Sequence, residues 1–136
     1  VWHGEGKLPN FLAELDILVN LLPATSATNG LINHALFSYL PKGAGFVNVG
    51  RGGHVVQSDL LQALDDGTLS GAVLDVVTPE PLPQGDALWH HPRLTITPHV
   101  ASEAAREVQA RYVADVVACL ARGEKPALLC DVTRGY

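Results

Sequence analysis

The chain has 136 residues, of which 47% are apolar, and it carries a formal net charge of −5. This length is typical of one domain, with enough apolar material for one hydrophobic core. The acidic balance excludes the basic surface by which proteins bind nucleic acid or anionic membranes, and no apolar run reaches the roughly 18 residues of a membrane span. We therefore expect neither nucleic acid nor a membrane as a partner.

Short apolar runs alternate with amphipathic stretches along most of the chain. The runs are rich in valine, isoleucine and leucine without strict polar alternation, which is typical of strands covered on both faces of a sheet. Because strand, helix and strand at this spacing imply right-handed crossovers, the pattern predicts an α/β fold with a parallel sheet of about four strands and flanking helices. The runs are LDILVNLLP (15–23), GFVNVG (45–50), GAVLDVV (71–77) and RLTITPH (93–99).

The stretches between these runs carry signals for helix ends. Asn33 could cap a short helix in INHALFSYLPKG, and Ser58 a longer one in QSDLLQALDDGTLS that ends before Gly67. DALWHHP has room for little more than one helical turn. Ser102 is the expected cap of the longest helix, which would end before Gly123. The apolar face of that helix is expected to consist of Val108, Tyr112, Val113, Val116, Val117 and Leu120.

Three further features concern the compartment, metal binding and the extent of the chain. Cys119 and Cys130 have neither C-x-x-C nor metal-ligand spacing, which favours free thiols in a reducing, cytoplasmic compartment over a disulfide. His90-His91 lacks a third ligand at a suitable spacing, so no metal site is predicted. The sequence contains no methionine, so we expect it to be part of a longer polypeptide.

Distinctive residues follow each of the four predicted strands. In open parallel sheets, ligands bind in the crevice outside the carboxyl ends of the strands. Because the distinctive residues after all four strands come together at this one edge of the sheet, the sequence predicts a ligand site there. At the four ends lie Leu22-Pro23, Gly50-Arg51-Gly52-Gly53, the acidic residues Asp75 and Glu80, and Pro98-His99.

Arg51 is a candidate anion-binding residue. Its planar guanidinium can bind a carboxylate through two parallel hydrogen bonds. The glycines on both sides leave room for a ligand and allow unusual backbone angles. An incidental arginine in a surface turn is the alternative that this motif leaves open.

Glu80 and His99 form a candidate acid–base pair. A nearby carboxylate typically raises the pKa of a histidine by about 1–3 units and fixes its tautomer. Placed against a carbonyl oxygen, such an acid accelerates a reaction roughly 10²–10⁴-fold. Their separation in sequence equally fits a loop glutamate and a core-edge histidine that never meet. Asp75 could orient a polar ligand group or hold a loop together.

Longer segments resemble the D-isomer-specific 2-hydroxyacid dehydrogenases, and most closely their glyoxylate/hydroxypyruvate reductase branch. The resemblance covers nearly the whole chain and rests on LVNLLPATSATNGLIN, GAGFVNVGRGGHVVQSDLLQALDDGTLSGAVLDVV, EPLPQGDALWHHPRLTITPHVAS and TRGY. It implies that residues 1–101 form the carboxyl-terminal part of a Rossmann-like dinucleotide-binding domain. Residues 102–136 would be a long helix and tail that return to a substrate domain.

The sequence also departs from the family pattern. The glycine-rich G-x-G-x-x-G turn that holds a pyrophosphate is absent from it, as is the substrate domain. We therefore expect a fragment that is inactive by itself. Its first strand, in DILVNLLP, would be an exposed sheet edge because its partner strand is missing.

The resemblance also implies roles for the candidate residues. Arg51 would bind the carboxylate and keto group of a 2-oxoacid, and His99 would donate a proton with Glu80 as its partner. NAD or NADP, with NADP slightly favoured by the branch, would be lined by Leu22, Pro23, Thr28, Val49, Gly50, Arg51, Asp75 and Ser102.

The expected function of the full-length parent follows from these roles. It is the NAD(P)H-dependent reduction of glyoxylate or hydroxypyruvate by a homodimeric cytoplasmic enzyme. Alternatives are a phosphoglycerate- or lactate-type dehydrogenase of the same family, or a non-enzymatic dinucleotide-sensing module.

Overall fold

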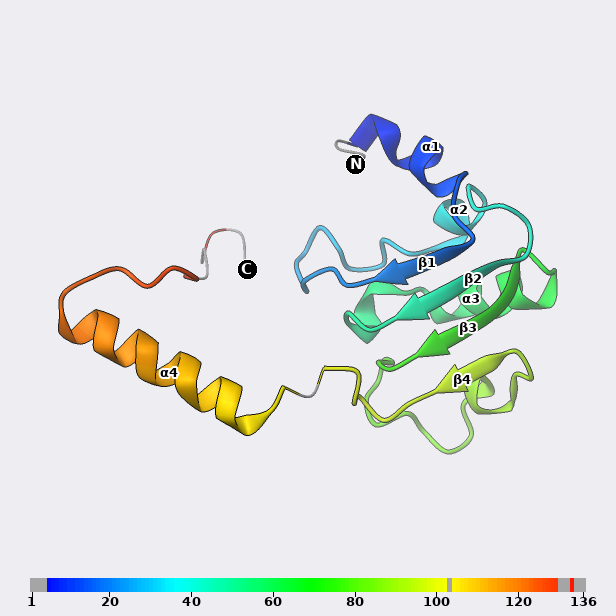
Figure 1. The fold of residues 1–136 in the computed structure, drawn as a ribbon. Coiled ribbons are helices and arrows are strands. Elements are labelled where there is room, and N and C mark those ends of the chain that lie inside the picture. Colours follow the sequence, from blue (N-terminus) through cyan, green and yellow to red (C-terminus); the bar gives the residue numbers. More distant parts are fainter. Residues whose placement is uncertain (1–4, 103, 130–132, 134–136) are drawn as a thin grey trace. The chain divides into compact units, whose positions relative to one another are not determined.

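Figure 1 shows the computed structural model of the chain, which describes residues 5–102, 104–129 and 133. By its internal contacts the chain divides into two compact units, Val1–Val100 and Ala101–Tyr136. In the part of the chain that the structure describes, no helix is both long and apolar enough to cross a lipid bilayer.

The first unit is built on a parallel four-stranded sheet with the strand order β1-β2-β3-β4, which confirms the predicted α/β class (Figure 1). Each strand ends before its apolar run does, so the last residues of each run belong to the loop at the carboxyl end of the sheet. Among the described residues β1 pairs only with β2, and it is therefore the exposed edge strand that we expected. The strands are β1 (Ile17–Asn20), β2 (Ala44–Asn48), β3 (Leu69–Leu74) and β4 (Leu94–Ile96).

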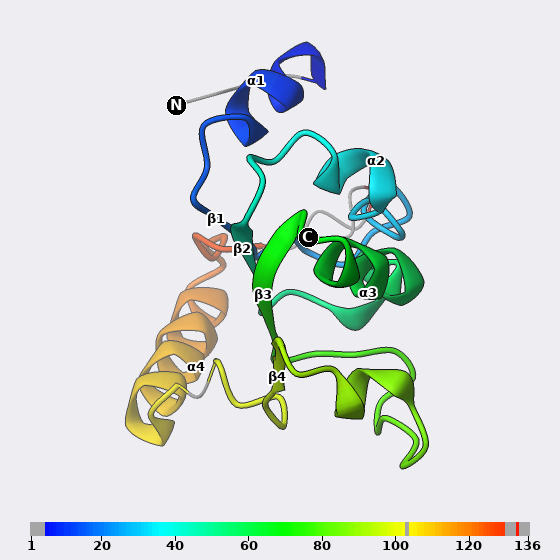
Figure 2. The same cartoon turned by 90° about the vertical axis from the view of Figure 1, so that its right-hand side faces the viewer.

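Two helices, α2 (His34–Phe37) and α3 (Gln57–Asp65), cover one face of the sheet (Figure 2). Asn33 caps α2 as predicted, since its side chain accepts a hydrogen bond from the Leu36 N–H. A single helical turn, η3 (Ala87–His90), precedes β4, also as predicted. Short helices that we did not predict are η1 (Glu5–Lys7), α1 (Leu8–Leu12) and η2 (Gly52–His54).

The predicted serine caps are wrong for both longer helices. Helix α3 begins one residue before Ser58, and its N-cap is Val56, which makes no side-chain cap hydrogen bond. The first turn instead holds Asp59, whose carboxylate suits the positive end of the helix dipole and accepts the His34 N–H at 2.8 Å. Ser102 lies outside α4 (Arg106–Ala121), whose N-cap is Ala105.

The hydrophobic core lies between the sheet and these two helices. Phe46 of β2 and Phe37 of α2 meet edge to face with ring centroids 5.4 Å apart, a preferred geometry for aromatic pairs. Leu60 and Leu64 of α3 are completely buried on the same side. This packing anchors the strands, and through them the loops that leave their carboxyl ends.

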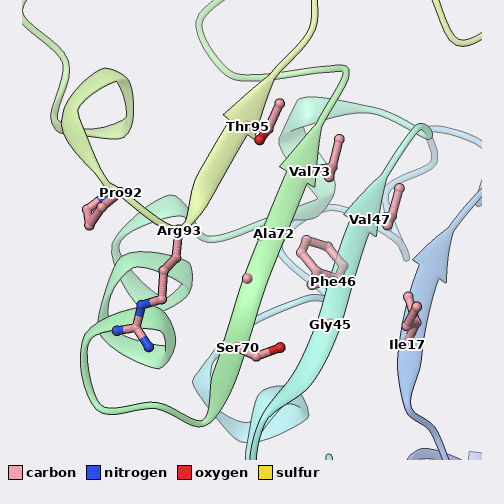
Figure 3. Close-up of a pocket in the computed structure, with 11 residues that line it drawn as sticks. Ile17, Gly45, Phe46, Val47, Ser70, Ala72, Val73, Pro92, Arg93 and Thr95 are labelled. Atoms are coloured by element: carbon pink, nitrogen blue, oxygen red, sulfur yellow. The ribbon is translucent and has the colours of Figure 1, made fainter.

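The opposite face of the sheet differs from our expectation that both faces are covered. Val19, Val47, Val73 and Thr95 stand in register across the four strands, and Figure 3 shows the last three of them. Val19, Val73 and Thr95 are exposed to solvent, as is Ile17 beside them. Within the described part of the first unit, no helix packs over this row, which is why its apolar side chains remain accessible.

The second unit consists of α4 and the segment after it. The helix ends before Gly123 (φ 72°) as predicted, just as α3 ends before Gly67 (φ 78°). None of its residues is buried, and the predicted apolar residues Val108, Val113 and Leu120 are exposed. The thiol of Cys119 is free, whereas Cys130 lies outside the described residues.

Candidate active site

The turn after β4 gives His99 an unusual backbone conformation. His99 has φ 57°, and among the described residues it is the only non-glycine in the left-handed region. Its N–H donates to the carbonyls of Asp75 and Thr97, both at 3.0 Å. Such a conformation costs about 1–3 kcal/mol and persists only where the surrounding structure enforces it, typically at functional sites. The backbone therefore marks His99 as a functional candidate.

Asp75 holds this turn in place from the end of β3. Its side chain is buried, and Oδ1 accepts hydrogen bonds from the Thr97 hydroxyl and from the Val100 N–H. The carboxylate therefore ties down the chain on both sides of His99. These contacts support the alternative that Asp75 holds a loop together, and its role toward a cofactor stays a prediction.

His99 and Glu80 lie side by side at this edge of the sheet. Nδ1 of His99 is 2.9 Å from Oε1 of Glu80, so the alternative in which the two never meet is wrong. Both side chains are partly exposed, 47% for His99 and 43% for Glu80. A carboxylate accepts only, so Nδ1 carries the proton of this hydrogen bond. The other ring nitrogen, Nε2, is left to exchange a proton with a ligand.

Arg51 follows β2 in a turn of residues 50–53, which we call the Arg51 turn. Its side chain is exposed, and Nη1 donates to the carbonyl of the preceding residue, Gly50, at 2.7 Å. Within residues 5–102, 104–129 and 133, Arg51 makes no ion pair. The remaining guanidinium N–H groups can therefore bind an anionic ligand.

The Arg51 turn packs closely against the loop that leads to Glu80. A Cβ atom on Gly52 would lie 2.0 Å from the Val77 carbonyl oxygen and 2.5 Å from Oγ1 of Thr78. No side chain fits there, so glycine is required by the close approach of two backbones. This contact brings the carboxyl ends of β2 and β3 together, as the parallel sheet predicts.

The loop after β1 contains three of the predicted cofactor residues. Leu22 and Pro23 are exposed, and Thr28 closes the loop by donating from Oγ1 to the Pro23 carbonyl at 2.8 Å. The same oxygen accepts the Thr25 N–H at 2.9 Å. We call residues 21–28 the Pro23 loop. Its exposed apolar side chains offer a surface that a flat ring could cover.

The remaining predicted cofactor residues are distributed between the two units. Val49 and Gly50 lie at the carboxyl end of β2, where the Val49 N–H donates to the Asn20 carbonyl at 3.2 Å. Ser102 belongs to the second unit. The role of these residues toward a dinucleotide stays a prediction, and the sequence contains no glycine-rich G-x-G-x-x-G turn that would hold a pyrophosphate. The described residues contain no group of His, Cys, Asp and Glu arranged as metal ligands.

Three buried polar residues that we did not predict lie behind this site, namely Asn20, Asn48 and His54. They are 4%, 0% and 2% exposed and contact one another. A signal was available, because each asparagine lies inside an apolar run and a buried amide requires hydrogen-bond partners. Asn20 and Asn48 are also the last residues of β1 and β2, so their side chains lie at the predicted edge.

Comparisons with known proteins agree with this architecture. Residues 3–101 match the family model for the D-isomer specific 2-hydroxyacid dehydrogenase, NAD binding domain. A D-isomer specific 2-hydroxyacid dehydrogenase from Xanthobacter autotrophicus Py2, in complex with NADPH and MES, is 40% identical with a TM-score of 0.94, over 99% of this chain and 56% of its own. A family protein from Klebsiella pneumoniae 342 is 48% identical with a TM-score of 0.87, over 96% of this chain and 42% of its own.

A third structure is an NADPH-dependent glyoxylate/hydroxypyruvate reductase from Sinorhizobium meliloti in complex with NADP and sulfate. It is 37% identical with a TM-score of 0.93, over 98% of this chain and 44% of its own. The chain thus spans 42% to 56% of the lengths of these three proteins. Both the family model and these identities show that the chain belongs to the D-isomer specific 2-hydroxyacid dehydrogenase family, and residues 3–101 match the NAD-binding domain of that family.

Proposed function

We propose that this chain is part of an NAD(P)H-dependent reductase that converts a small 2-oxoacid to the 2-hydroxyacid. The observation that carries the proposal is the contact of 2.9 Å between His99 and Glu80 at the carboxyl edge of the sheet. The strained backbone of His99 and the exposed guanidinium of Arg51 at the same edge support it.

In this proposal residues 1–101 are the carboxyl-terminal part of the dinucleotide-binding domain. Residues 102–136 lead back to a substrate-binding domain. The extent of the family match, residues 3–101, supports the first assignment. The second assignment rests on the resemblance to the family, and residues 102–136 lie beyond the extent of the family match.

Arg51 would bind the carboxylate of the 2-oxoacid. Its exposed guanidinium has donors left over from the Gly50 contact, and a planar fork matches a carboxylate in two parallel hydrogen bonds. Binding of the carboxylate orients the keto group. In the most favourable cases, such orientation of the reactants lowers the activation barrier by about 7–11 kcal/mol.

His99 would deliver the proton that the reduction requires. The Glu80 carboxylate occupies Nδ1, so Nε2 is the nitrogen that can face the substrate oxygen. The reduced nicotinamide, when bound, would supply the hydride to the keto carbon. As negative charge develops on the keto oxygen, Nε2–H stabilises it and transfers its proton, and Glu80 stabilises the imidazolium before transfer.

Leu22, Pro23, Thr28, Val49, Gly50, Arg51 and Asp75 would hold the dinucleotide at this edge of the sheet. Ser102, which lies outside the first unit, is also a proposed cofactor residue. We propose glyoxylate or hydroxypyruvate as the substrate and NADP(H) as the preferred cofactor. Similarity to the Sinorhizobium protein, an NADPH-dependent glyoxylate/hydroxypyruvate reductase, supports both choices, and the NADPH complex of the Xanthobacter relative supports the choice of cofactor.

The test is a substrate panel with the full-length enzyme. Oxidation of NADPH and of NADH is followed by absorbance with glyoxylate, hydroxypyruvate, pyruvate and 3-phosphohydroxypyruvate as substrates. We expect the highest kcat/KM with glyoxylate or hydroxypyruvate. Absence of turnover with every 2-oxoacid would favour a dinucleotide-sensing module instead. The 136-residue chain alone is expected to show no turnover, because it lacks the glycine-rich pyrophosphate turn.

A further inference from the structure

We propose that Asn20, Asn48 and His54 form a buried positioning cluster that fixes the Arg51 turn relative to the Pro23 loop. We call these three residues the amide–imidazole cluster. The inference rests on the proposed function, because Arg51 is the residue proposed to bind the substrate carboxylate. None of the three side chains is assigned a contact with substrate or cofactor, so they are positioning residues.

The cluster joins the carboxyl ends of two adjacent strands. Asn20 ends β1 and Asn48 ends β2, and the two residues face each other in the register of the sheet. Nδ2 of Asn20 donates to Oδ1 of Asn48 at 2.8 Å and lies 2.9 Å from Nδ1 of His54. All three side chains are almost completely buried, so water does not compete for these hydrogen bonds.

From this cluster, hydrogen bonds reach the backbone on both sides of Arg51. Oδ1 of Asn48 accepts the Gly50 N–H at 3.1 Å, and Nδ2 of Asn48 donates to the Arg51 carbonyl at 3.1 Å. Oδ1 of Asn20 accepts the Leu22 N–H at 3.2 Å. The same cluster therefore sets the Arg51 turn and the first residues of the Pro23 loop.

The hydrogen-bond pattern determines which way each group faces. Because Oδ1 of Asn20 accepts from Leu22, its two N–H groups point to Asn48 and to His54. Nδ1 of His54 must then be an acceptor, and its ring proton lies on Nε2. Nε2 is buried and has no hydrogen-bond partner among the described residues. A second proton on Nδ1 would set two donors against each other and break the link to Asn20.

The electrostatic surroundings keep this acceptor available. Burial is the largest influence and lowers the pKa of His54, the backbone of Pro23 raises it by less, and the charge of Arg51 lowers it further. The neutral imidazole is therefore favoured in the folded protein.

Gly50 provides independent evidence that the amide–imidazole cluster packs closely against the Arg51 turn. A Cβ atom at this position would lie 2.8 Å from Nδ2 of Asn20 and 3.2 Å from Nδ1 of His54. It would also lie 3.2 Å from the Leu22 carbonyl. The turn can reach its position only because residue 50 has no side chain.

The test compares His54→Leu with His54→Asn in the full-length enzyme. Leucine removes the acceptor, whereas asparagine places Oδ1 where Nδ1 of histidine was. Because misplacement by about 1 Å can cost 10²-fold in rate, we expect His54→Leu to lower kcat/KM for the 2-oxoacid about 10–10²-fold, mainly through KM. His54→Asn should recover most of the loss. Leu64→Ala, a core truncation in α3, is the matched control that lowers the unfolding temperature but leaves this KM unchanged.

Amide hydrogen exchange supplies a readout that does not depend on activity. Peptides that cover residues 21–24 and 49–52 should exchange faster in His54→Leu than in Leu64→Ala. Unchanged KM and unchanged exchange in His54→Leu, despite a lowered unfolding temperature, would overturn the proposal. If the wild-type enzyme turns over no 2-oxoacid, the proposed function fails, and the exchange comparison still decides whether the cluster positions the turn.

Discussion

Nδ1 of His99 lies 2.9 Å from Oε1 of Glu80, although the two residues follow different strands. Glu80 belongs to the loop after β3 and His99 to the turn after β4, and these strands are neighbours in the parallel sheet. The sheet therefore makes this pair possible, and the hydrogen bonds around Asp75 hold the histidine in its left-handed conformation. Neither residue is sequestered, so the pair remains accessible to a ligand.

Replacement of Glu80 by glutamine tests the charge of the pair separately from its geometry. The glutamine oxygen can still accept the Nδ1–H of His99, but the negative charge that stabilises the imidazolium is lost. We expect kcat for 2-oxoacid reduction to fall about 10–10³-fold, because such a partner both orients and stabilises the catalytic imidazolium. Steady-state kinetics measure this, and an unchanged kcat would show that the carboxylate has no electrostatic role.

Arg51→Lys tests the substrate-binding role of the guanidinium. Lysine keeps the positive charge but loses the planar pair of donors. A hydrogen bond to a charged group contributes about 1.5–3 kcal/mol, so we expect kcat/KM for the 2-oxoacid to fall roughly 10–10²-fold. The Kd of NADPH, measured by fluorescence titration, should change much less. An equal loss of cofactor and substrate affinity would argue against a carboxylate-binding role.

Gly52→Ala tests the close packing of the Arg51 turn. The new Cβ would lie 2.0 Å from the Val77 carbonyl oxygen, so the backbone must shift. Overpacking of this kind typically costs about 1–3 kcal/mol, which should appear as a lowered free energy of unfolding in urea. The matched control is Gly85→Ala, where an added Cβ meets no atom within 4 Å and φ is not positive. Equal stabilities of the two variants would contradict the packing described above.

The lowered pKa of His54 predicts a pH-dependent stability. In the unfolded chain this histidine takes up a proton near its ordinary pKa of about 6.5, whereas the folded chain resists protonation. The contribution of His54 to the free energy of unfolding is therefore fully present above this ordinary pKa, and it decreases as the pH falls below it. Urea unfolding of the full-length enzyme between about pH 7.5 and 5, a range that includes the ordinary histidine pKa, measures how the free energy of unfolding changes with pH.

The control for the pH experiment is His54→Asn, which keeps an acceptor for Asn20 but has no proton to take up. Its stability should depend less on pH over this range than that of the wild type. Identical slopes for both proteins would mean that His54 does not titrate differently in the folded and unfolded states.

Much of the fold follows from the apolar runs alone. The four runs that end near Leu22, Gly50, Val77 and His99 each contain a strand, because valine, isoleucine and leucine without alternation suit a parallel sheet. The predicted serine caps of the two longer helices are wrong. Ser58 and Ser102 fit the capping preference, but the helices begin elsewhere, with no side-chain cap at Val56 or Ala105.

The candidate site was predictable in part. Glu80 and His99 lie at strand ends, and the topology of a parallel sheet brings such ends together. The roles of Asn20, Asn48 and His54 could not be derived from spacing, because they depend on which amide atom faces which backbone group. Those orientations are set by tertiary contacts such as the Leu22 N–H and the Arg51 carbonyl.

The most direct test of the account is the replacement of His99 by alanine in the full-length enzyme. We expect kcat for glyoxylate or hydroxypyruvate reduction to fall about 10²–10⁴-fold, as for removal of a general acid, while the Kd of NADPH stays close to that of the wild type. His90→Ala, an exposed histidine in η3, is the matched control and should keep full activity. A His99→Ala enzyme that retains the wild-type kcat would contradict the assignment of His99 as the proton donor.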